Sequence, residues 1–484
     1  MYINVCSAGN VSVAYVGSWL FQPTSPQSEP LWSPPGPRRS TFDLVQACIF
    51  TLILCSWTAV HPDIPAENME RRWKYKRLFS ALCAIIFPEL FLWIAFDELW
   101  ESRLICLKLK NLEATKEEPK VSPDGNAHRT SIRETVCGLW HIVCRTWRNV
   151  FPPELERGFY IEMGGFELVS DLGEGRDLPS GFKGRVTPWG AIELARVGLL
   201  PKVPLELIND QSKSDLLAKF LVCLQAGWMV IQCIARVAQC LPLTLLEVHT
   251  VMNAICAFFI YCLWLKKPHD VRVTTKVRVN DEMLKELKNI VANSPPRLDR
   301  GRDVPRKYGG RDVPRKFKLT ETEPDAGFLA VARSSCGLSQ SKQSPISELV
   351  MTCLAFPTYG GVHLTVWKGH FPSNLERILW RASALSIMGL PFLVLAGEFL
   401  LKWIRHQSRK GRCKDSESYL ASLRRHQIWG WFVLYKFLAT LQGIALGFWV
   451  FARIYIVVES FASLRNLPIG SYDAVSWLSL IPHF

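Results

Sequence analysis

The stretch LFSALCAIIFPELFLWIAF, from Leu78 to Phe96, is apolar except for a single carboxylate near its middle. A helix needs about 20 largely apolar residues to cross a bilayer, and this stretch has that length. Pro88 removes a backbone donor and lets a helix kink, and Glu89 puts an ionisable group beside the kink. Such a group is costly within a membrane and is therefore a functional candidate. The stretch predicts a kinked transmembrane helix with a carboxylate near its centre.

Further apolar stretches along the chain predict crossings of the same kind. Five of them are clear: Phe42–Val60, Leu216–Ala235, Leu245–Leu265, Ala382–Leu401 and Trp431–Ala452. A weaker one, Leu349–Trp367, is interrupted by Pro357, Gly360 and Gly361 and made more polar by His363. The expected fold is an all-α membrane protein with about seven transmembrane helices, six clear and one broken. A mixed extramembrane loop region completes it.

The distribution of basic residues favours counting Leu349–Trp367 as a crossing. Basic loops follow Leu265 and Leu401, and a single crossing between them would place them on opposite sides of the membrane. Two crossings place both in the cytosol, which gives seven crossings and a cytosolic N-terminus. The glycosylation sequon Asn10-Val11-Ser12 is then expected to stay unmodified.

One basic loop resists this orientation, because it would face outward. It contains Arg71, Arg72, Lys74, Lys76 and Arg77. These residues belong either to an amphipathic helix at the interface or to a chain of inverted topology.

Composition and charge narrow the class of partner. The 484 residues are 49% hydrophobic, with a formal net charge of +14 and a mean hydropathy of +0.10. The cations crowd the ends of apolar segments, where anionic lipids favour them, and no nucleic-acid-binding signature accompanies them. The expected partners are the lipid bilayer and, at the basic loops, anionic lipid head groups, with no nucleic acid. The expected location is an endomembrane or the plasma membrane.

Six regions follow from the alternation of apolar and polar sequence. They are 1–41 (flexible N-terminal tether), 42–97 (first helical pair), 98–215 (extramembrane loop region), 216–265 (second helical pair), 266–345 (basic linker) and 346–484 (C-terminal helical membrane region). Within the loop region, Val136–Trp147 has the spacing of an amphipathic helix, and Phe159–Val169 predicts strands about a Gly164–Gly165 turn.

The basic linker contains a tandem near-repeat, GRDVPRKY at 301–308 and GRDVPRKF at 310–317. Nine residues are too few for a folding repeat, so a duplicated solvated linker is the plain interpretation. Binding of phosphate or of lipid head groups is the sharper alternative.

The ionisable residues inside apolar stretches are the candidate site residues. They are Glu89, His249, His363, Glu398, Lys436 and, at the end of a stretch, Glu459. Glu247 also lies within an apolar stretch, near its end. Carboxylates with lysine and histidine suit a proton relay, an acid-initiated reaction or a substrate counter-ion. For each residue a structural role is the competing interpretation, as for Glu398 and Lys402 at helical i,i+4 spacing. Lys436 is the lysine well inside a crossing, and it is the expected partner of Glu89.

Several known chemistries leave no trace in the sequence. It has no CxxC motif, no Cys/His cluster with zinc spacing and no clustered histidine boxes. A nucleophile elbow, a P-loop and a dinucleotide-binding glycine motif are likewise missing from the sequence. No cofactor or metal is therefore expected, and an enzyme with an unfamiliar site stays open.

Collinear blocks of the sequence resemble a large family of uncharacterised multi-pass membrane proteins of filamentous fungi. The blocks are Phe42–Pro65, Gly158–Leu168, Gln225–Glu247, Tyr359–Trp367, Ile378–Leu385 and Ala452–Phe484. The duplicated linker and the N-terminal tether look like departures from the family. The resemblance implies the membrane architecture, and it implies no activity that transfers residue by residue. By association it also implies an accessory role in a secondary-metabolite pathway, with the enzymes of that pathway as partners.

Three functions remain open at this point. The first is a non-enzymatic multi-pass membrane protein, such as a pathway accessory, scaffold or sensor. The second is a membrane-embedded enzyme that acts on a lipophilic metabolite by acid–base chemistry, with Glu89 and Glu398 as candidate acids. The third is a transporter or a transport accessory.

Overall fold

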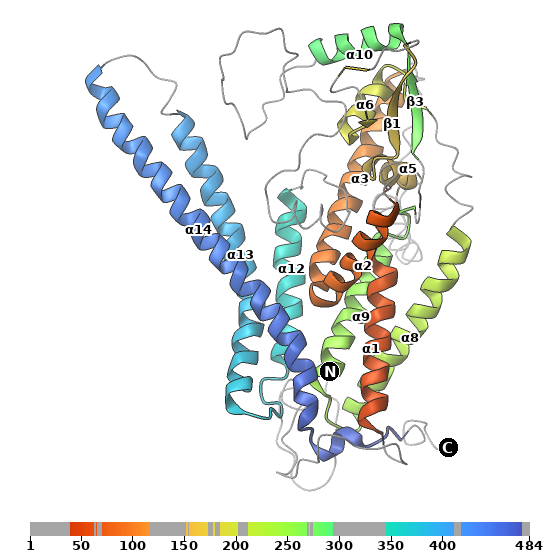
Figure 1. Ribbon diagram of the computed structural model, residues 1–484, viewed down its shortest axis with the longest axis vertical. Helices are drawn as coiled ribbons and strands as arrows, with labels where there is room; N and C mark the ends of the chain where they lie inside the picture. Colours follow the sequence, from red (N-terminus) through yellow and green to blue (C-terminus); the bar gives the residue numbers. More distant parts are fainter. Residues whose placement is uncertain are drawn as a thin grey trace, which may run out of the picture.

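The computed structural model describes residues 39–61, 64, 70–116, 152, 154–172, 178–179, 184–201, 212–268, 271, 274–293, 345–410 and 418–476. Long helices run side by side along one axis, and a small unit of strands and short helices caps one end of them (Figure 1). We call this end the sheet end. The first and last described residues lie at the other end, the terminal end, where the Arg39 amide donates to the Tyr472 carbonyl at 2.9 Å.

Helix α1 (Thr41–Ala59) begins at the terminal end and runs toward the sheet end (Figure 1). Ser40 caps it: its hydroxyl accepts from the Asp43 amide, and the Asp43 carboxylate accepts from the Ser40 amide. This reciprocal capping box satisfies amides that the start of a helix leaves unpaired. The helix coincides with the predicted stretch Phe42–Val60 to within a residue.

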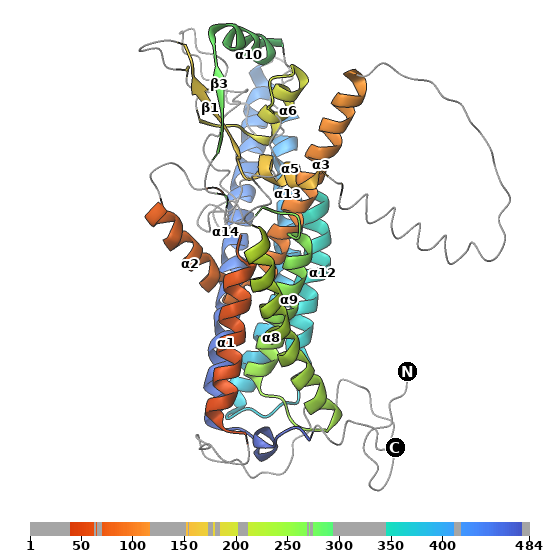
Figure 2. The same cartoon turned by 90° about the vertical axis from the view of Figure 1, so that its right-hand side faces the viewer.

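The helices α2 (Glu70–Ile86) and α3 (Pro88–Lys116) depart most from the sequence prediction. Phe87 separates them, and the two apolar halves are bent by 114° at this break. Figure 2 shows both helices rising from their junction toward the sheet end. A proline is disfavoured inside a helix but favoured at the first position of a new one, which accounts for the break at Pro88. The expectation of one kinked helix across Leu78–Phe96 is therefore wrong, because the chain turns back.

Helices α8 (Ser212–Ala238) and α9 (Leu245–Leu263) form an antiparallel pair joined at the terminal end. A second capping box starts α9, in which the Glu247 carboxylate accepts from the Thr244 amide at 2.9 Å. Of the apolar window of α9, 72% is buried, against 17% for α13 and 22% for α14. Helix α9 is therefore the central helix of the bundle.

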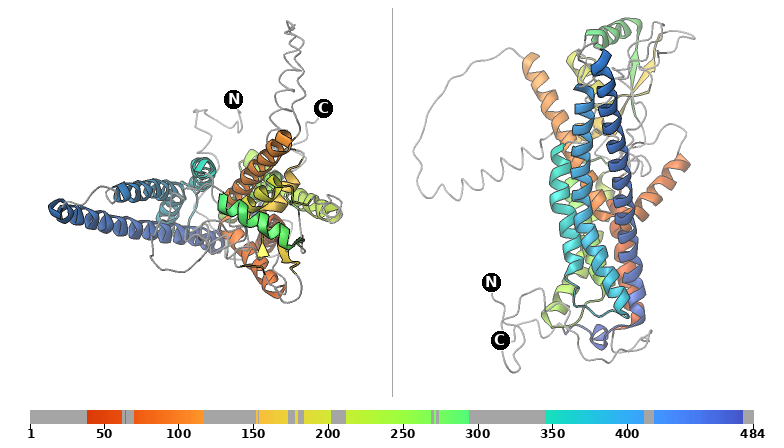
Figure 3. Two further views of the ribbon diagram at one scale, coloured as in Figure 1. Left: turned by 90° about the horizontal axis from the view of Figure 1, so that it is seen from above. Right: turned by 90° about the vertical axis from the view of Figure 1, so that its left-hand side faces the viewer.

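Three helices complete the bundle: α12 (Pro345–Leu364), α13 (Asn374–Lys410) and α14 (Ser418–Ala462). They lie side by side in alternating directions, and α13 and α14 are the longest helices in the described part of the chain (Figure 3). Gly360 allows the close approach of α12 to α13, since a Cβ there would lie 2.9 Å from the Ala384 carbonyl. Two short 3-10 turns, Ser463–Arg465 and Ile469–Tyr472, follow at the terminal end.

The sheet end carries a three-stranded sheet of order β2-β1-β3. Strand β1 (Phe166–Ser170) pairs antiparallel with β2 (Gly184–Arg185) and parallel with β3 (Thr275–Val279), which comes from beyond the α8–α9 pair. Three short helices pack around it: α5 (Leu155–Glu162), α6 (Pro188–Arg196) and α10 (Asp281–Asn293). Buried apolar side chains from these elements and from α3 form one core.

Residues Phe159–Val169 form a helix and then a strand, so the prediction of strands on both sides of the turn is wrong. Helix α5 continues to Glu162, the chain turns at Gly164 with a φ of +72°, and β1 then begins. The Gly165 amide donates to the Tyr160 carbonyl, and a Cβ at Gly165 would collide with the Tyr160 ring. Burial raises the pKa of Tyr160, whose hydroxyl bonds to Thr275 act in the opposite direction. The predicted helix at Val136–Trp147 and the duplicated segment lie outside the described residues.

Five helices in the described ranges are long and apolar enough to cross a membrane. Their apolar parts are Thr41–Ala59, Phe220–Ala238, Leu245–Leu263, Asn374–Leu401 and Val433–Arg465. The α2–α3 pair passes the same test only as a bent unit, and the apolar part of α12, Leu349–Leu364, is shorter. The protein is thus mostly helical with several helices of membrane-crossing length, and the α2–α3 break is the main revision.

Candidate functional site

The break between α2 and α3 puts a carboxylate in the interior of the helix bundle. Glu89 lies in the first turn of α3 and is fully buried. Its Oε2 accepts a hydrogen bond of 2.7 Å from Nη2 of Arg453 on α14, which is fully buried as well. Phe87, at the break, packs in the same apolar cluster as Cys256 from the middle of α9. The ion pair therefore lies about halfway along the bundle.

The ion pair is incompletely satisfied by its surroundings. Among the described residues, Oε1 of Glu89 and both Nε and Nη1 of Arg453 have no hydrogen-bond partner. The Arg453 guanidinium instead lies over the Tyr359 ring, 3.8 Å from its centroid, and 6.0 Å from that of Phe87. A cation over an aromatic face gains some electrostatic stabilisation, but it leaves the N–H groups without acceptors.

His249 on α9 lies beside this pair and contacts polar groups through both ring nitrogens. The Asn253 side-chain nitrogen donates to the His249 carbonyl and lies 3.1 Å from His249 Nε2. His249 Nδ1 lies 3.1 Å from the Tyr359 hydroxyl. These three buried side chains form a continuous hydrogen-bonded row from α9 to α12.

His363 on α12 completes the group. Its Nδ1 donates to the Tyr359 carbonyl at 2.8 Å, and its ring stacks on the Tyr359 ring with centroids 4.5 Å apart. The Trp380 indole donates to the His363 carbonyl at 3.0 Å and fixes this part of α12 against α13. Within the described chain, Nε2 of His363 is buried without a partner. We call Glu89, Arg453, Tyr359, His249 and His363 the charged centre.

Three of the six predicted site residues therefore come together. Glu89, His249 and His363 are distant in sequence, and the bundle brings them into one cluster. Glu459 lies six residues beyond Arg453, about 9 Å along the helix. There its carboxylate accepts from the Tyr455 hydroxyl at 3.3 Å.

Glu398 and Lys436 lie away from the charged centre. Met388 packs against Gly360, next to Tyr359, and Glu398 is about 15 Å further along α13. Lys436 is an exposed residue of α14, about 25 Å from Arg453 along the helix. The expected Glu89–Lys436 pair is therefore wrong, and Arg453 takes that place.

Sequence reasoning missed Arg453 and Tyr359 for different reasons. The last predicted crossing ends at Ala452, one residue short of Arg453, because hydropathy alone treats an arginine as the edge of an apolar segment. The helix continues as RIYIVVES, and this apolar continuation is the signal that could have kept Arg453 inside. Tyr359 carries no charge, so only its neighbours in space mark it.

A second buried ion pair lies nearer the sheet end. Glu98 on α3 accepts from the Lys267 ammonium at 2.8 Å, and both side chains are fully buried. Lys267 also donates to the His61 carbonyl at 3.0 Å and lies 4.4 Å from the centroid of the Trp264 ring. This pair joins α3 to the segments that follow α1 and α9.

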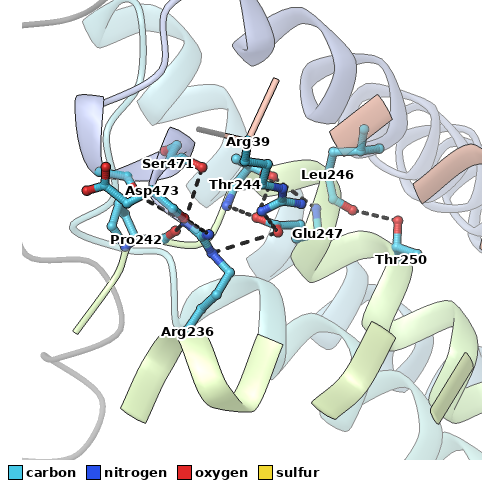
Figure 4. Close-up of polar contacts among 10 residues, drawn as sticks. Arg39, Arg236, Pro242, Thr244, Leu246, Glu247, Thr250, Ser471 and Asp473 are labelled. Atoms are coloured by element: carbon cyan, nitrogen blue, oxygen red, sulfur yellow. Dashed lines mark hydrogen bonds and ion pairs between the residues drawn. The ribbon is translucent and has the colours of Figure 1, made fainter. Parts of the chain in front are cut away.

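A third group of charges, which we call the terminal cluster, contains Arg39, Arg236 and Glu247 (Figure 4). Glu247 Oε1 lies 2.6 Å from Arg39 Nη1 and 4.0 Å from Arg236 Nε. Arg236 donates through its terminal nitrogens to carbonyls of Pro242, Gly470, Ser471 and Asp473, at 2.8 to 3.2 Å. The cluster therefore joins the start of α1, the α8–α9 connection and the C-terminal segment.

The comparisons with known proteins identify a family without identifying a function. Residues 15–294 and 336–484 match the sequence model of a family of unknown function (DUF8562). The chain belongs to this family. No curated protein and no solved structure matches it.

The family match bears on two of the expected departures. The unmatched stretch 295–335 contains the duplicated basic segment, as expected of an insertion. The match begins at residue 15, so the expectation that the N-terminal tether departs from the family is wrong for residues 15–41. The fungal source and the link with secondary metabolism stay predictions.

In chemical terms the charged centre can exchange protons and hold an anion. It contains a carboxylate, a guanidinium, two imidazoles and a phenol. In the described part of the chain, no group of three or more His, Cys, Asp and Glu side chains is arranged to hold a metal ion. Within the described chain, four buried side-chain atoms of the charged centre have no hydrogen-bond partner, which is unusual for buried polar groups.

Proposed function

We propose that the protein is an integral membrane protein with six crossings and one re-entrant hairpin, and that it works as a proton-linked transporter. The six crossings are α1, α8, α9, α12, α13 and α14. The re-entrant hairpin is α2–α3, which enters and leaves at the sheet end. This replaces the seven crossings that hydropathy favours.

The arrangement of the helix ends supports this topology. An even number of crossings returns the chain to the side on which it started, and the two described chain ends meet at the terminal end. Irregular backbone at membrane depth is tolerated where protein surrounds it, and the break at Phe87 lies against α9, α12 and α14.

The same topology gives an orientation. Three basic segments now fall at the sheet end: the start of α2, the segment after α9, and the junction of α13 and α14. Their basic residues include Arg71, Arg72, Lys74, Lys76, Arg77, Lys266, Lys276, Arg278, Arg405, Arg409, Arg424 and Arg425. The positive-inside rule puts this end in the cytosol, near anionic lipid head groups, and the two termini on the opposite side. The loop that resisted a cytosolic N-terminus then fits.

Glycosylation and accessible tags test the topology. With the N-terminus outside the cytosol, the sequon at Asn10 is expected to carry a glycan that an endoglycosidase removes and Asn10→Gln abolishes. Tags inserted near Gln343 and near Ser373 should be accessible from opposite sides, and a tag before Glu70 from the side of the Gln343 tag. An unglycosylated Asn10 together with a cytosolic N-terminal tag would overturn the orientation.

The observation that carries the transport proposal is the half-satisfied Glu89–Arg453 pair at the tip of the re-entrant hairpin. Charged groups are costly at the centre of a bilayer, about 2.5–3.5 kcal/mol each on insertion scales. A purely structural pair would be expected to fill most of its remaining donors and acceptors. In the described chain the Glu89–Arg453 pair leaves three atoms unfilled, against the single oxygen Oε1 of Glu98 in the Glu98–Lys267 pair. Broken helices with charged tips at mid-depth are also the usual construction of transporter sites.

Proton movement through reconstituted protein tests the proposal. When Arg453 leaves Glu89, a carboxylate away from water neutralises itself by taking up a proton. Liposomes with the protein and a pH-sensitive dye should acidify after an external acid pulse, and Glu89→Gln should abolish this response. Glu98→Gln, on the same helix and paired with Lys267, is the matched control and should retain it. Equal acidification with Glu89→Gln and with the unmodified protein would refute the proposal.

A second function has one observation in its favour. The row Asn253–His249–Tyr359 ends beside the Glu89–Arg453 pair, which is the juxtaposition of acid and base that a membrane-embedded enzyme would need. A deletion strain should then accumulate a lipophilic precursor, and the purified protein should convert this precursor. If the metabolites are unchanged and proton movement depends on Glu89, the enzyme is excluded and the transporter remains.

A further inference from the structure

We propose that Arg453 is the binding site for a small organic monocarboxylate, which takes the position that the Glu89 carboxylate occupies on the guanidinium. The inference rests on the proposed transport function and supplies its substrate class. Protonation of Glu89 would release Arg453 and the ligand would then bind, so that the anion can accompany the proton.

The guanidinium has the unused donors that such a ligand requires. One nitrogen, Nη2, donates to Glu89, and Nε and Nη1 have no partner among the described residues. A planar guanidinium binds a carboxylate best through two parallel N–H···O bonds. The single bond to Glu89 uses less than this capacity, so a free carboxylate can form a better pair with Arg453 than the tethered one does.

The first turn of α3 adds a favourable field. This 29-residue helix begins at Pro88 in the interior of the bundle, with Glu89 as its first acidic residue. The N-terminal end of a helix carries a partial positive charge and favours anions. A carboxylate on Arg453 would lie beside this end, as the Glu89 carboxylate does now.

The surroundings of Arg453 select the rest of the ligand. The Phe87 ring stacks on Trp449 at 5.3 Å, and Trp449 meets Phe356 edge-on at 5.9 Å. These rings and Tyr359 belong to the apolar cluster that surrounds the pair. The charged centre supplies one guanidinium and no second cation. A single carboxylate on an aromatic or aliphatic body matches this environment, and a dicarboxylate would bury an unpaired charge.

Binding of benzoate and benzamide to the purified protein tests the inference. The full chain in lipid nanodiscs is titrated by calorimetry, and thermal unfolding first establishes that each variant is folded. Glu89→Gln removes the competing carboxylate and should bind benzoate at least tenfold more tightly than the unmodified protein. Arg453→Gln should lose benzoate binding, and the control Glu98→Gln should bind as the unmodified protein does. Benzamide, which has the same shape without the charge, should bind weakly and equally to all four.

A second variant keeps the test decisive if Glu89→Gln does not fold. Glu89→Ala leaves room for a carboxylate beside Arg453, so acetate or propionate should raise its unfolding temperature, and acetamide should not. Benzoate binding no tighter than benzamide binding in the unmodified protein and Glu89→Gln, or no effect of acetate on Glu89→Ala, would overturn the inference. Carboxylate binding without proton movement in liposomes would instead leave the site standing and refute the transport proposal.

Discussion

The charged centre and the terminal cluster are two groups of buried charges in one bundle. They differ in how many of their donors and acceptors are hydrogen-bonded. In the terminal cluster, Glu247 uses both oxygens, one toward Arg39 and Arg236 and the other toward the Thr244 amide and hydroxyl. In the charged centre, Glu89 uses one oxygen, and Arg453 uses one of its three nitrogens within the described chain.

This difference separates two uses of a buried charge. Arg236 donates to four carbonyls of two chain segments, the α8–α9 connection and the C-terminal segment, so any movement of its guanidinium would break several bonds at once (Figure 4). Arg453 is held by one hydrogen bond and by aromatic faces, which give way more easily. In the terminal cluster Nε of Arg236 lacks a hydrogen-bond partner within the described chain, whereas in the Glu89–Arg453 pair three atoms do. A largely satisfied network stabilises one arrangement, and a half-satisfied one can change partners. The terminal cluster is accordingly a structural fastening, and the charged centre is the part able to respond.

The largest effect on stability is expected at the terminal cluster. Glu247→Gln leaves Arg39 and Arg236 without a counter-charge, and breaking a buried pair by removing one partner costs about 3–5 kcal/mol. Thermal unfolding in nanodiscs should show a lower midpoint for Glu247→Gln than for Glu89→Gln, whose partner already lacks acceptors. An equal or larger loss with Glu89→Gln would contradict the distinction between the two groups.

A smaller effect is expected when both members of the charged centre are neutralised together. Arg453→Gln alone leaves Glu89 as an unpaired buried acid, and Glu89→Gln alone leaves the guanidinium. The double variant removes both charges, so it should be more stable than the sum of the two single losses predicts, by about 0.5–3 kcal/mol. Additive losses in the same unfolding measurement would mean that the two side chains do not act as a pair.

The positions of the apolar segments were predictable from sequence, and the arrangement of the resulting helices in space was not. The stretches at Phe42–Val60 and Leu245–Leu265 coincide with α1 and α9, because length and hydropathy determine such helices locally. Hydropathy carries no information on the direction in which the chain runs. It could therefore not distinguish a crossing over Leu78–Phe96 from a hairpin that turns at Pro88. The proline was the local signal of a break, and it was interpreted as a kink.

The site was predictable to the extent that an ionisable residue inside a long apolar segment is unusual. This criterion selected Glu89, His249 and His363, which the bundle brings into one cluster, although nothing in the sequence predicted that they are neighbours. It also selected Glu398 and Lys436, because an apolar segment does not tell which face of its helix meets protein and which meets lipid. The sheet strand β3 was missed because its partner β1 lies more than 100 residues earlier in the chain.

Two adjacent glycines of α12 offer a finer test of how the charged centre is positioned. A Cβ at Gly360 would lie 2.9 Å from both the Ala384 carbonyl and the Met388 Cβ, and at Gly361 it would meet nothing within 4 Å. Gly360→Ala should cost about 1–3 kcal/mol through overpacking next to Tyr359. Gly361→Ala should be neutral, or stabilising by up to about 1 kcal/mol through helix propensity. Similar unfolding midpoints for the two variants would argue against close packing of α12 on α13.

The smallest effect is expected at Lys436, and its size distinguishes two partners for Glu89. If Lys436 were the partner of Glu89, as the sequence alone predicts, Lys436→Met would be as harmful as Glu89→Gln. Lys436 is exposed on α14, about 25 Å along that helix from the residue that contacts Glu89, so its charge is not needed there. Lys436→Met should change the free energy of unfolding by less than about 0.5 kcal/mol and leave proton movement in liposomes intact. Loss of proton movement with Lys436→Met, at unchanged stability, would contradict the Glu89–Arg453 pairing and restore the lysine as the functional counter-charge.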